Sequence, residues 1–186
     1  MRRLLLIVDP QIDFITGTLP VPGAEAAMDA LAAYLAEQDG GYVHKVVTCD
    51  FHPFEHCSFA ANGGPWPVHC VAHSTGAAVW PALFDALHAC SGKVEVLCKG
   101  QDAAEEEYSI FKNAYARERI QSLVDELGID IIEVCGLAGD ICVLQTLRDG
   151  VDIFGAEKFR VLPQFAPSLD GGAALDAFIE ELACTR

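Results

Sequence analysis

The sequence predicts an α/β fold with three layers, in which helices cover both faces of a central, mostly parallel sheet. Short apolar runs rich in β-branched residues alternate with longer amphipathic stretches, which is typical of parallel sheets with crossover helices. The 186 residues, of which 52% are hydrophobic, are enough to bury one sizeable core. No internal repeat, linker or low-complexity tract divides the chain, so we expect a single domain over residues 1–186.

Five segments have the composition of strands and five have the pattern of helices. The first apolar run ends at Asp9, a Pro-Gly pair precedes the first helix, and Gly128 ends the third helix. The predicted strands span residues 3–9, 43–49, 94–98, 129–134 and 159–162. The predicted helices span residues 24–38, 79–89, 114–127, 141–148 and 173–183. Two long loops remain, 50–76 and 100–113, and loops of such length in a compact domain usually carry function.

The net charge and the cysteines indicate which partners and which cellular compartment to expect. The formal net charge of −15 and the pI near 4.5 argue against a nucleic-acid partner and against an anionic membrane surface. No apolar stretch approaches membrane-spanning length, and the N-terminal run stops at Asp9, too early for a secretory signal. None of the eight cysteines belongs to a Cys-x-x-Cys pair. We therefore expect reduced thiols in a cytoplasmic protein.

The segment 134–146 contains a candidate nucleophile. Gly136 and Gly139 follow an apolar strand and predict a tight turn, after which Asp140 is a plausible N-cap for a helix. Cys142 then lies in the first helical turn, where free backbone N–H groups and the helix dipole are expected to lower the thiol pKa. The alternative is that Cys142 is a small buried apolar residue, which is the commonest fate of a free cysteine.

Reactive side chains follow four predicted strands. Parallel sheets place their chemistry beyond the carboxyl ends of the strands, and Asp9, Asp50, Lys99 and Cys142 all come at these positions. Singly, Asp9 is also explained as a turn cap and Lys99 as a solvated strand-end charge. Four such side chains on one edge of the sheet favour a catalytic site.

These residue types suggest a mechanism of covalent catalysis. Cys142 would attack an electrophilic carbon, while Asp9 would accept the thiol proton and later return it to the leaving group. Lys99 would hold Asp9 and stabilise negative charge on the sulfur and on the tetrahedral intermediate. The backbone N–H groups of Ala138 and Cys142 are candidates for the oxyanion hole. A Cys-His pair is the weaker version, because the only histidines near a strand end follow Asp50.

The loop that starts at Asp50 contains a candidate metal site. Residues two apart on an extended backbone project to the same side, so Asp50 and His52 can converge on one point. His69, and also His56, are available to complete a set of three protein ligands with open positions for water or substrate. Carboxylate and imidazole ligands suit Zn(II), Fe(II) or Mn(II). The alternative is that these histidines only bond the loop backbone.

Five motifs that occur in order along the chain resemble those of the isochorismatase-like cysteine hydrolases. The likeness extends from about residue 3 to the last predicted helix, and among these hydrolases the sequence is most similar to the nicotinamidases, which also act on pyrazinamide. The motifs start at Asp9, Asp50, Trp66, Lys99 and Gly136, and read Asp-Pro-Gln-Ile-Asp-Phe, Asp-Phe-His-Pro, Trp-Pro-Val-His-Cys, Lys-Gly-Gln-Asp and Gly-Leu-Ala-Gly-Asp-Ile-Cys-Val.

The resemblance implies a catalytic triad of Asp9, Lys99 and Cys142, in an isochorismatase-like hydrolase fold. It implies that nicotinamide, a small-molecule amide, is hydrolysed to nicotinate and ammonia through a thioester.

The resemblance also assigns the metal and the substrate pocket. One divalent metal ion would be held by Asp50, His52 and His69, with His56 near it or on it through water, and would meet the pyridine nitrogen. Phe14 and Trp66 match positions that sandwich the ring. Tyr108, Leu137 and Ala138 match other pocket positions, and the Leu137–Ala138 peptide bond is expected to be cis.

The sequence departs from the family pattern at two positions and leaves alternatives open. Pro10 follows Asp9, at a position where the family usually has a residue with a backbone N–H. Gly139 stands where a threonine is common in the family, and the glycine loosens the turn that carries Cys142. Another amide or ureido hydrolase of the superfamily is the nearest alternative. A vinyl-ether hydrolase needs neither Cys142 nor the metal loop, and a non-catalytic ligand-binding domain needs none of the triad. A homo-oligomer is a further expectation.

Overall fold

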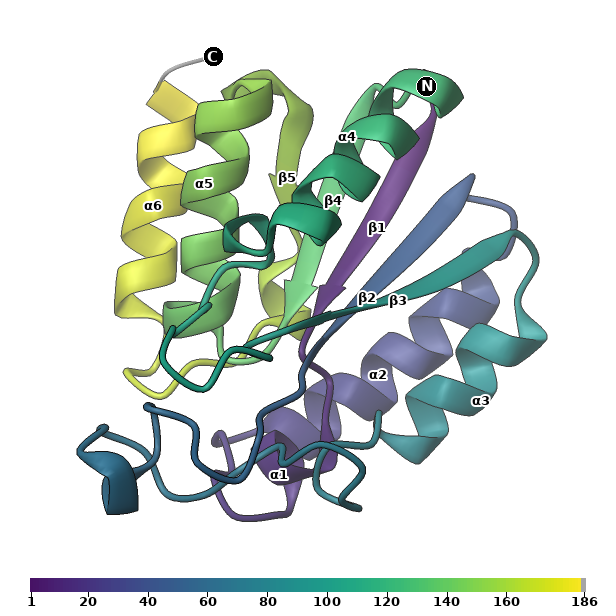
Figure 1. Cartoon of the computed structure of the whole chain (residues 1–186). Helices are drawn as coiled ribbons and strands as arrows, with labels where there is room; N and C mark the ends of the chain where they lie inside the picture. Colours follow the sequence, from purple (N-terminus) through teal and green to yellow (C-terminus); the bar gives the residue numbers. More distant parts are fainter. Residues whose placement is uncertain (185–186) are drawn as a thin grey trace.

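The computed structural model describes residues 1–184, and the last two residues of the predicted domain range lie outside the described part. A five-stranded sheet with the order β3-β2-β1-β4-β5 forms the centre, and all its neighbouring strands are parallel (Figure 1). The prediction of an α/β fold with a parallel sheet is therefore confirmed. The strands are β1 Arg3–Val8, β2 His44–Asp50, β3 Lys93–Lys99, β4 Ile131–Gly136 and β5 Phe159–Val161.

Helices cover both faces of this sheet, as the three-layer prediction requires (Figure 1). Successive side chains of β1 point to opposite faces of the sheet and so belong to two halves of the core. Leu5 and Ile7 pack toward α2 and α3, while Leu4 and Leu6 pack toward α4 and α5. All four of these side chains are fully buried. The helices are α1 Ile12–Ile15, α2 Ala24–Glu37, α3 Pro81–Ala89, α4 Ala114–Leu127, α5 Leu144–Phe154 and α6 Ala173–Cys184. Within residues 1–184, no helix is long and apolar enough to cross a membrane.

The turn after β4 differs from the prediction. A π-helical turn, Gly139–Val143, precedes α5, so the backbone of Asp140 is already helical and Ala138 occupies the N-cap position. The prediction that Asp140 caps a helix is wrong. Its carboxylate instead accepts hydrogen bonds from the backbone N–H groups of Leu169 at 2.9 Å and Asp170 at 3.0 Å, and so ties this turn to the segment before α6.

Gly136 allows β4 to end close against β1. Its φ of 120° lies in a region that favours glycine, and a Cβ there would collide with the backbone of Val8. The chain can therefore turn sharply at the point where β1 and β4 both end.

The loop between β2 and α3 is fixed to the sheet at several points. The N–H of His52 donates to the carbonyl of Cys70, and the N–H of Ala72 donates back to the carbonyl of His52. The buried carboxylate of Asp13 accepts hydrogen bonds from the backbone N–H groups of Cys70 at 2.7 Å and Thr18 at 3.2 Å. Asp13 thus holds together two loops at the carboxyl edge of the sheet.

Replacing Asp13 with alanine is expected to lower the free energy of unfolding by about 1–3 kcal/mol, because buried N–H groups lose their acceptor. Urea denaturation measures the change, and Asp85→Ala, at an exposed position of α3, is the matched control. Equal stability of the two variants would contradict this role of Asp13.

Candidate active site

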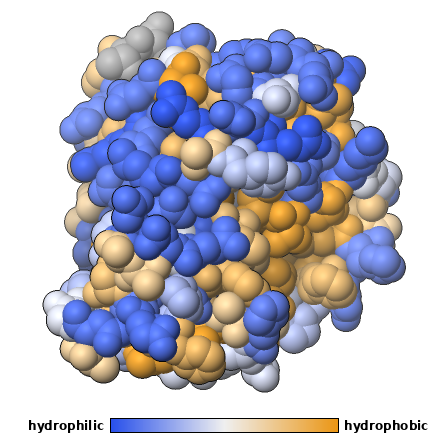
Figure 2. Space-filling view, in the orientation of Figure 1, coloured by the Kyte–Doolittle hydropathy of each residue, from blue (hydrophilic) through white to orange (hydrophobic). Residues whose placement is uncertain are grey.

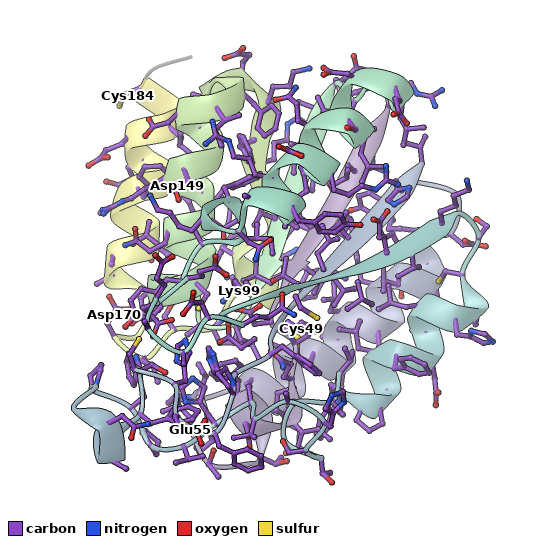
Figure 3. The ribbon with its side chains drawn as sticks, in the orientation of Figure 1. Cys49, Glu55, Lys99, Asp149, Asp170 and Cys184 are labelled. Atoms are coloured by element: carbon purple, nitrogen blue, oxygen red, sulfur yellow. The ribbon has the colours of Figure 1, made fainter. Side chains whose placement is uncertain are left out.

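The structure brings Asp9, Lys99 and Cys142 together at the carboxyl edge of the sheet. Asp9 follows β1, Lys99 ends β3, and Cys142 lies in the π-helical turn after β4. The Lys99 ammonium nitrogen is 2.8 Å from Oδ2 of Asp9 and 3.7 Å from Sγ of Cys142. All three side chains are buried. Figure 3 labels Lys99, which ends β3.

Asp50 completes the charge cluster from the end of β2. It pairs in register with Lys99, and its Oδ1 lies 2.5 Å from the Lys99 nitrogen. Burial acts to lower the pKa of Lys99, but the carboxylates of Asp50 and Asp9 outweigh it and raise that pKa well above its usual value. Lys99 is therefore a permanent cation that bridges two carboxyl groups.

The two carboxyl groups beside Lys99 titrate in opposite directions. Burial raises the pKa of Asp9 against the opposing effect of the Lys99 ammonium. Burial also acts on Asp50, but there Lys99 and His52 prevail and hold the pKa below its usual range. Asp50 therefore stays ionised, while Asp9 is suited to take up and release a proton.

The Cys142 thiol is more basic than the sequence suggested. Burial raises its pKa well above the usual value, and the negative charges of Asp9 and Asp50 add to this effect, while Lys99 opposes it. The prediction of a lowered thiol pKa at the helix start is therefore wrong. The resting sulfur carries its proton, and a neighbouring base has to remove it during reaction.

Thr48 positions that base. Its hydroxyl donates to Oδ1 of Asp9 at 2.6 Å, and its carbonyl oxygen accepts from the N–H of Asp9 at 3.1 Å. Asp9 has a φ of 46°, a left-handed conformation that aspartate tolerates better than most residues. Sequence reasoning missed Thr48, although a polar residue within a buried strand was an available signal.

The peptide bond between Leu137 and Ala138 is cis, as the resemblance implied. Ala138 and Cys142 both line the pocket. Within residues 1–184, the backbone N–H of Ala138 contacts no hydrogen-bond acceptor. This N–H is therefore free to bind an oxygen atom of a ligand.

Asp50, His52 and His69 form a group that fits one divalent metal ion. One ligand atom from each lies within 4.8 Å of the others. Nδ1 of His52 donates to the carbonyl of Gly100, and Nδ1 of His69 donates to the carbonyl of Pro67, which leaves Nε2 of each ring with its lone pair. Nε2 of His52 is buried and has no hydrogen-bond partner among the described residues. A buried imidazole nitrogen without a hydrogen-bond partner, next to a carboxylate, fits a ligand set for a divalent metal ion.

His56 lies beside this group but does not join it. Its ring stacks on that of His52, with centroids 3.9 Å apart. Its Nδ1 contacts the hydroxyl of Ser58 at 2.7 Å, and its Nε2 donates to the carbonyl of Glu105 at 3.0 Å. Both ring nitrogens of His56 contact other groups in this structure, and the expectation that His56 lies near the metal or binds it through water stays a prediction.

A pocket with about 380 Å³ of empty space connects the sulfur to the metal ligands. Phe14, Trp66, Tyr108 and Ala138 line it as predicted, and the Trp66 indole donates to the Tyr108 hydroxyl at 3.0 Å. Leu137 does not line it, because its side chain is fully buried in the core, and this prediction is corrected. Sequence reasoning missed five further lining residues, of which only Ile141 lies within a motif: Leu19, Val21, Glu106, Ile141 and Leu169.

Gln11 holds the backbone of Asp50 from both sides. Its amide nitrogen donates to the carbonyl oxygens of Asp50 at 2.8 Å and Ala77 at 2.9 Å, and its Oε1 accepts from the N–H of Asp50 at 2.7 Å. Gln11 is fully buried. The sequence marked it only as part of the first motif, yet it is a positioning residue for Asp50.

Comparison with known proteins decides the family. The isochorismatase domain matches residues 3–153. The chain belongs to the isochorismatase family. Nicotinamidase/pyrazinamidase of Mycobacterium tuberculosis is 36% identical over 156 residues, with 80% of this chain and 78% of the relative covered.

Solved structures agree with this assignment to the isochorismatase family. The PnC1 protein of L. infantum in complex with nicotinate has a TM-score of 0.82 at 30% identity, covering 98% of this chain and 90% of that one. Pyrazinamidase of Pyrococcus horikoshii in complex with zinc has a TM-score of 0.76 at 25% identity, covering 99% and 96%.

Gln11→Met is expected to weaken metal binding by about 10- to 100-fold, because the backbone that carries Asp50 loses its fixed orientation. Titration of metal-free protein with zinc measures the affinity. Ile120→Val, at a buried position of α4, is a control for general destabilisation. Wild-type metal affinity in Gln11→Met would reject the positioning role.

Proposed function

We propose that this isochorismatase-family protein is an amidohydrolase that converts nicotinamide to nicotinate and ammonia through a cysteine thioester. The observation that carries the proposal is the contact of Lys99 with both the Asp9 carboxylate and the Cys142 sulfur, at one end of a small aromatic-lined pocket. The similarity to nicotinamidases and to a nicotinate complex supports the choice of substrate.

The first half of the reaction acylates Cys142. Asp9 accepts the thiol proton as the sulfur attacks the amide carbon, and Lys99 stabilises the negative charge that develops beside it. The amide oxygen becomes an oxyanion that the N–H groups of Ala138 and Cys142 bind. Asp9 then returns its proton to the amide nitrogen, and the C–N bond breaks to release ammonia.

The second half hydrolyses the thioester. Asp9 removes a proton from a water molecule, whose oxygen attacks the acyl carbon. The C–S bond breaks, nicotinate leaves, and Cys142 recovers its proton from Asp9. The raised pKa of Asp9 suits this exchange because the group must be a base and an acid in turn.

We infer that Asp50, His52 and His69 hold one divalent metal ion, Zn, Fe or Mn, beside the pocket. When bound, the ion supplies an open coordination position for the pyridine nitrogen. Asp50 and His69 both line the pocket, and Phe14 packs against His69 with ring centroids 5.5 Å apart. Phe14 and Trp66 would hold the substrate ring, which directs its amide toward Cys142.

The partner is a small molecule in this proposal, and we place the protein in the cytoplasm. The net charge of −15 opposes binding to nucleic acid and to anionic membranes. The eight cysteines are all free, as expected where thiols stay reduced.

Cys142→Ala is expected to lower the rate of ammonia release from nicotinamide by about 10⁴-fold or more, because the nucleophile is lost. The exposed Cys184→Ala is the matched control and should keep wild-type activity. A wild-type protein that releases no ammonia from nicotinamide would reject the substrate. A fully active Cys142→Ala would reject the mechanism.

Removal of the metal with a strong chelator is expected to raise KM for nicotinamide, because the ring loses its contact with the metal. Elemental analysis verifies removal, and adding back zinc, iron or manganese in turn identifies the ion that restores activity. His69→Ala should lower the metal content per chain, whereas His88→Ala on α3 should not. Undiminished turnover of verified metal-free protein would contradict the metal's role.

A further inference from the structure

The outer edge of β3 is open. β3 is the last strand of the sheet and pairs only with β2, so the backbone groups of its other edge face outward. Proteins usually protect such an edge with proline, a bulge, a very short strand or charged side chains. This strand runs for seven residues, 93–99, without proline, and its exposed half carries the charged residues Lys93 and Glu95.

An apolar groove lies beside this open edge. Val94 and Val96 are 38% and 53% exposed, and Phe84 of α3 is 57% exposed. The three side chains line one hollow whose other walls include Leu87 and His88. Figure 2 shows an apolar area where Figure 1 places β3 and α3. The groove and the active-site pocket have no lining residue in common, so the patch is distinct from the active site.

The opposite face of the same strand carries charge. Lys93 and Glu95 alternate with the two valines and therefore point toward α4, where Arg119 contacts both carboxylate oxygens of Glu95 at 2.7 and 2.8 Å. A carboxylate has room for further hydrogen bonds beyond those two. Lys93 is exposed, with no ion pair among the described residues.

We propose that this edge of β3 is a two-fold interface with a second copy of the chain, in which the two strands pair antiparallel. Rotation about an axis normal to the sheet keeps the valines of both copies on the α3 face. Pairing Val94 with its own copy places Lys93 opposite Glu95 of the second chain, twice. Shifting one strand by two residues, so that Val94 faces Val96, places Glu95 opposite Glu95. A shift by two more residues places Lys93 opposite Lys99. Because like charges directly opposite one another are destabilising, the charges select the first register.

Self-association is tested first by sedimentation velocity from micromolar to millimolar protein. The wild-type chain should form a dimer as concentration rises. Lys93→Glu, which places like charges opposite each other at two points, should raise the dimer dissociation constant by about 10-fold or more. Lys112→Glu carries the same charge change at an exposed residue outside β3 and outside the apolar groove, and should leave the constant unaltered.

The register is tested by cross-linking in a Cys184→Ser background, which removes the exposed thiol. With diamide as the acceptor of two electrons and two protons, Val94→Cys should form a disulfide with its own copy, whereas Val96→Cys and the background chain should not. Circular dichroism and ammonia release report whether each variant is folded.

A chain that stays monomeric over the whole range overturns the proposal and leaves this surface to a different partner. A dimer that Lys93→Glu does not weaken, and that Val94→Cys does not cross-link, also overturns it by assigning the dimer to another surface.

Discussion

The buried ammonium of Lys99 is the constraint on which the active site depends. A lysine side chain with no exposed surface costs several kcal/mol in lost hydration, and only opposite charges in direct contact offset that cost. Asp9 and Asp50 supply them at 2.8 and 2.5 Å, from two other strands. Because the three strands end at one edge of a parallel sheet, the fold itself determines that these charges meet.

The pKa values of the two carboxyl groups that contact Lys99 shift in opposite directions. Asp50 also has His52 beside it, so its pKa falls and it remains an anion available to a metal. Asp9 has Thr48 as its other partner and no second cation, so burial prevails and its pKa rises. The environment of each group, and not its residue type, separates the proposed proton carrier, Asp9, from the proposed metal ligand, Asp50.

The sequence was sufficient to predict the parts that depend on periodicity and strand ends. Five parallel strands and helices on both faces followed from alternating apolar runs, and Asp9 and Lys99 were found because parallel strands end together. The parts that depend on tertiary contacts were not predictable. Asp140 bonds a segment about thirty residues away, where a local pattern suggested a cap.

The errors at the site have the same origin. The helix dipole is a local effect and led to the expectation of an acidic Cys142, whereas complete burial is a property of the whole fold and dominates the pKa. Gln11 gave no signal of its role, because its partners Asp50 and Ala77 become neighbours only when the chain is folded.

The edge position of β3 connects the active site with the proposed interface. The strand is exposed at its start, where Lys93 and Val94 lie, and buried at its end, where Lys99 meets the carboxylates. An edge strand has hydrogen-bonded neighbours on one side only, so its free end is the part that frays most easily. Pairing with a second copy would give the exposed half a second neighbour. The same strand would then be held at one end by a buried ion cluster and at the other by its partner, which favours a fixed position for the catalytic lysine.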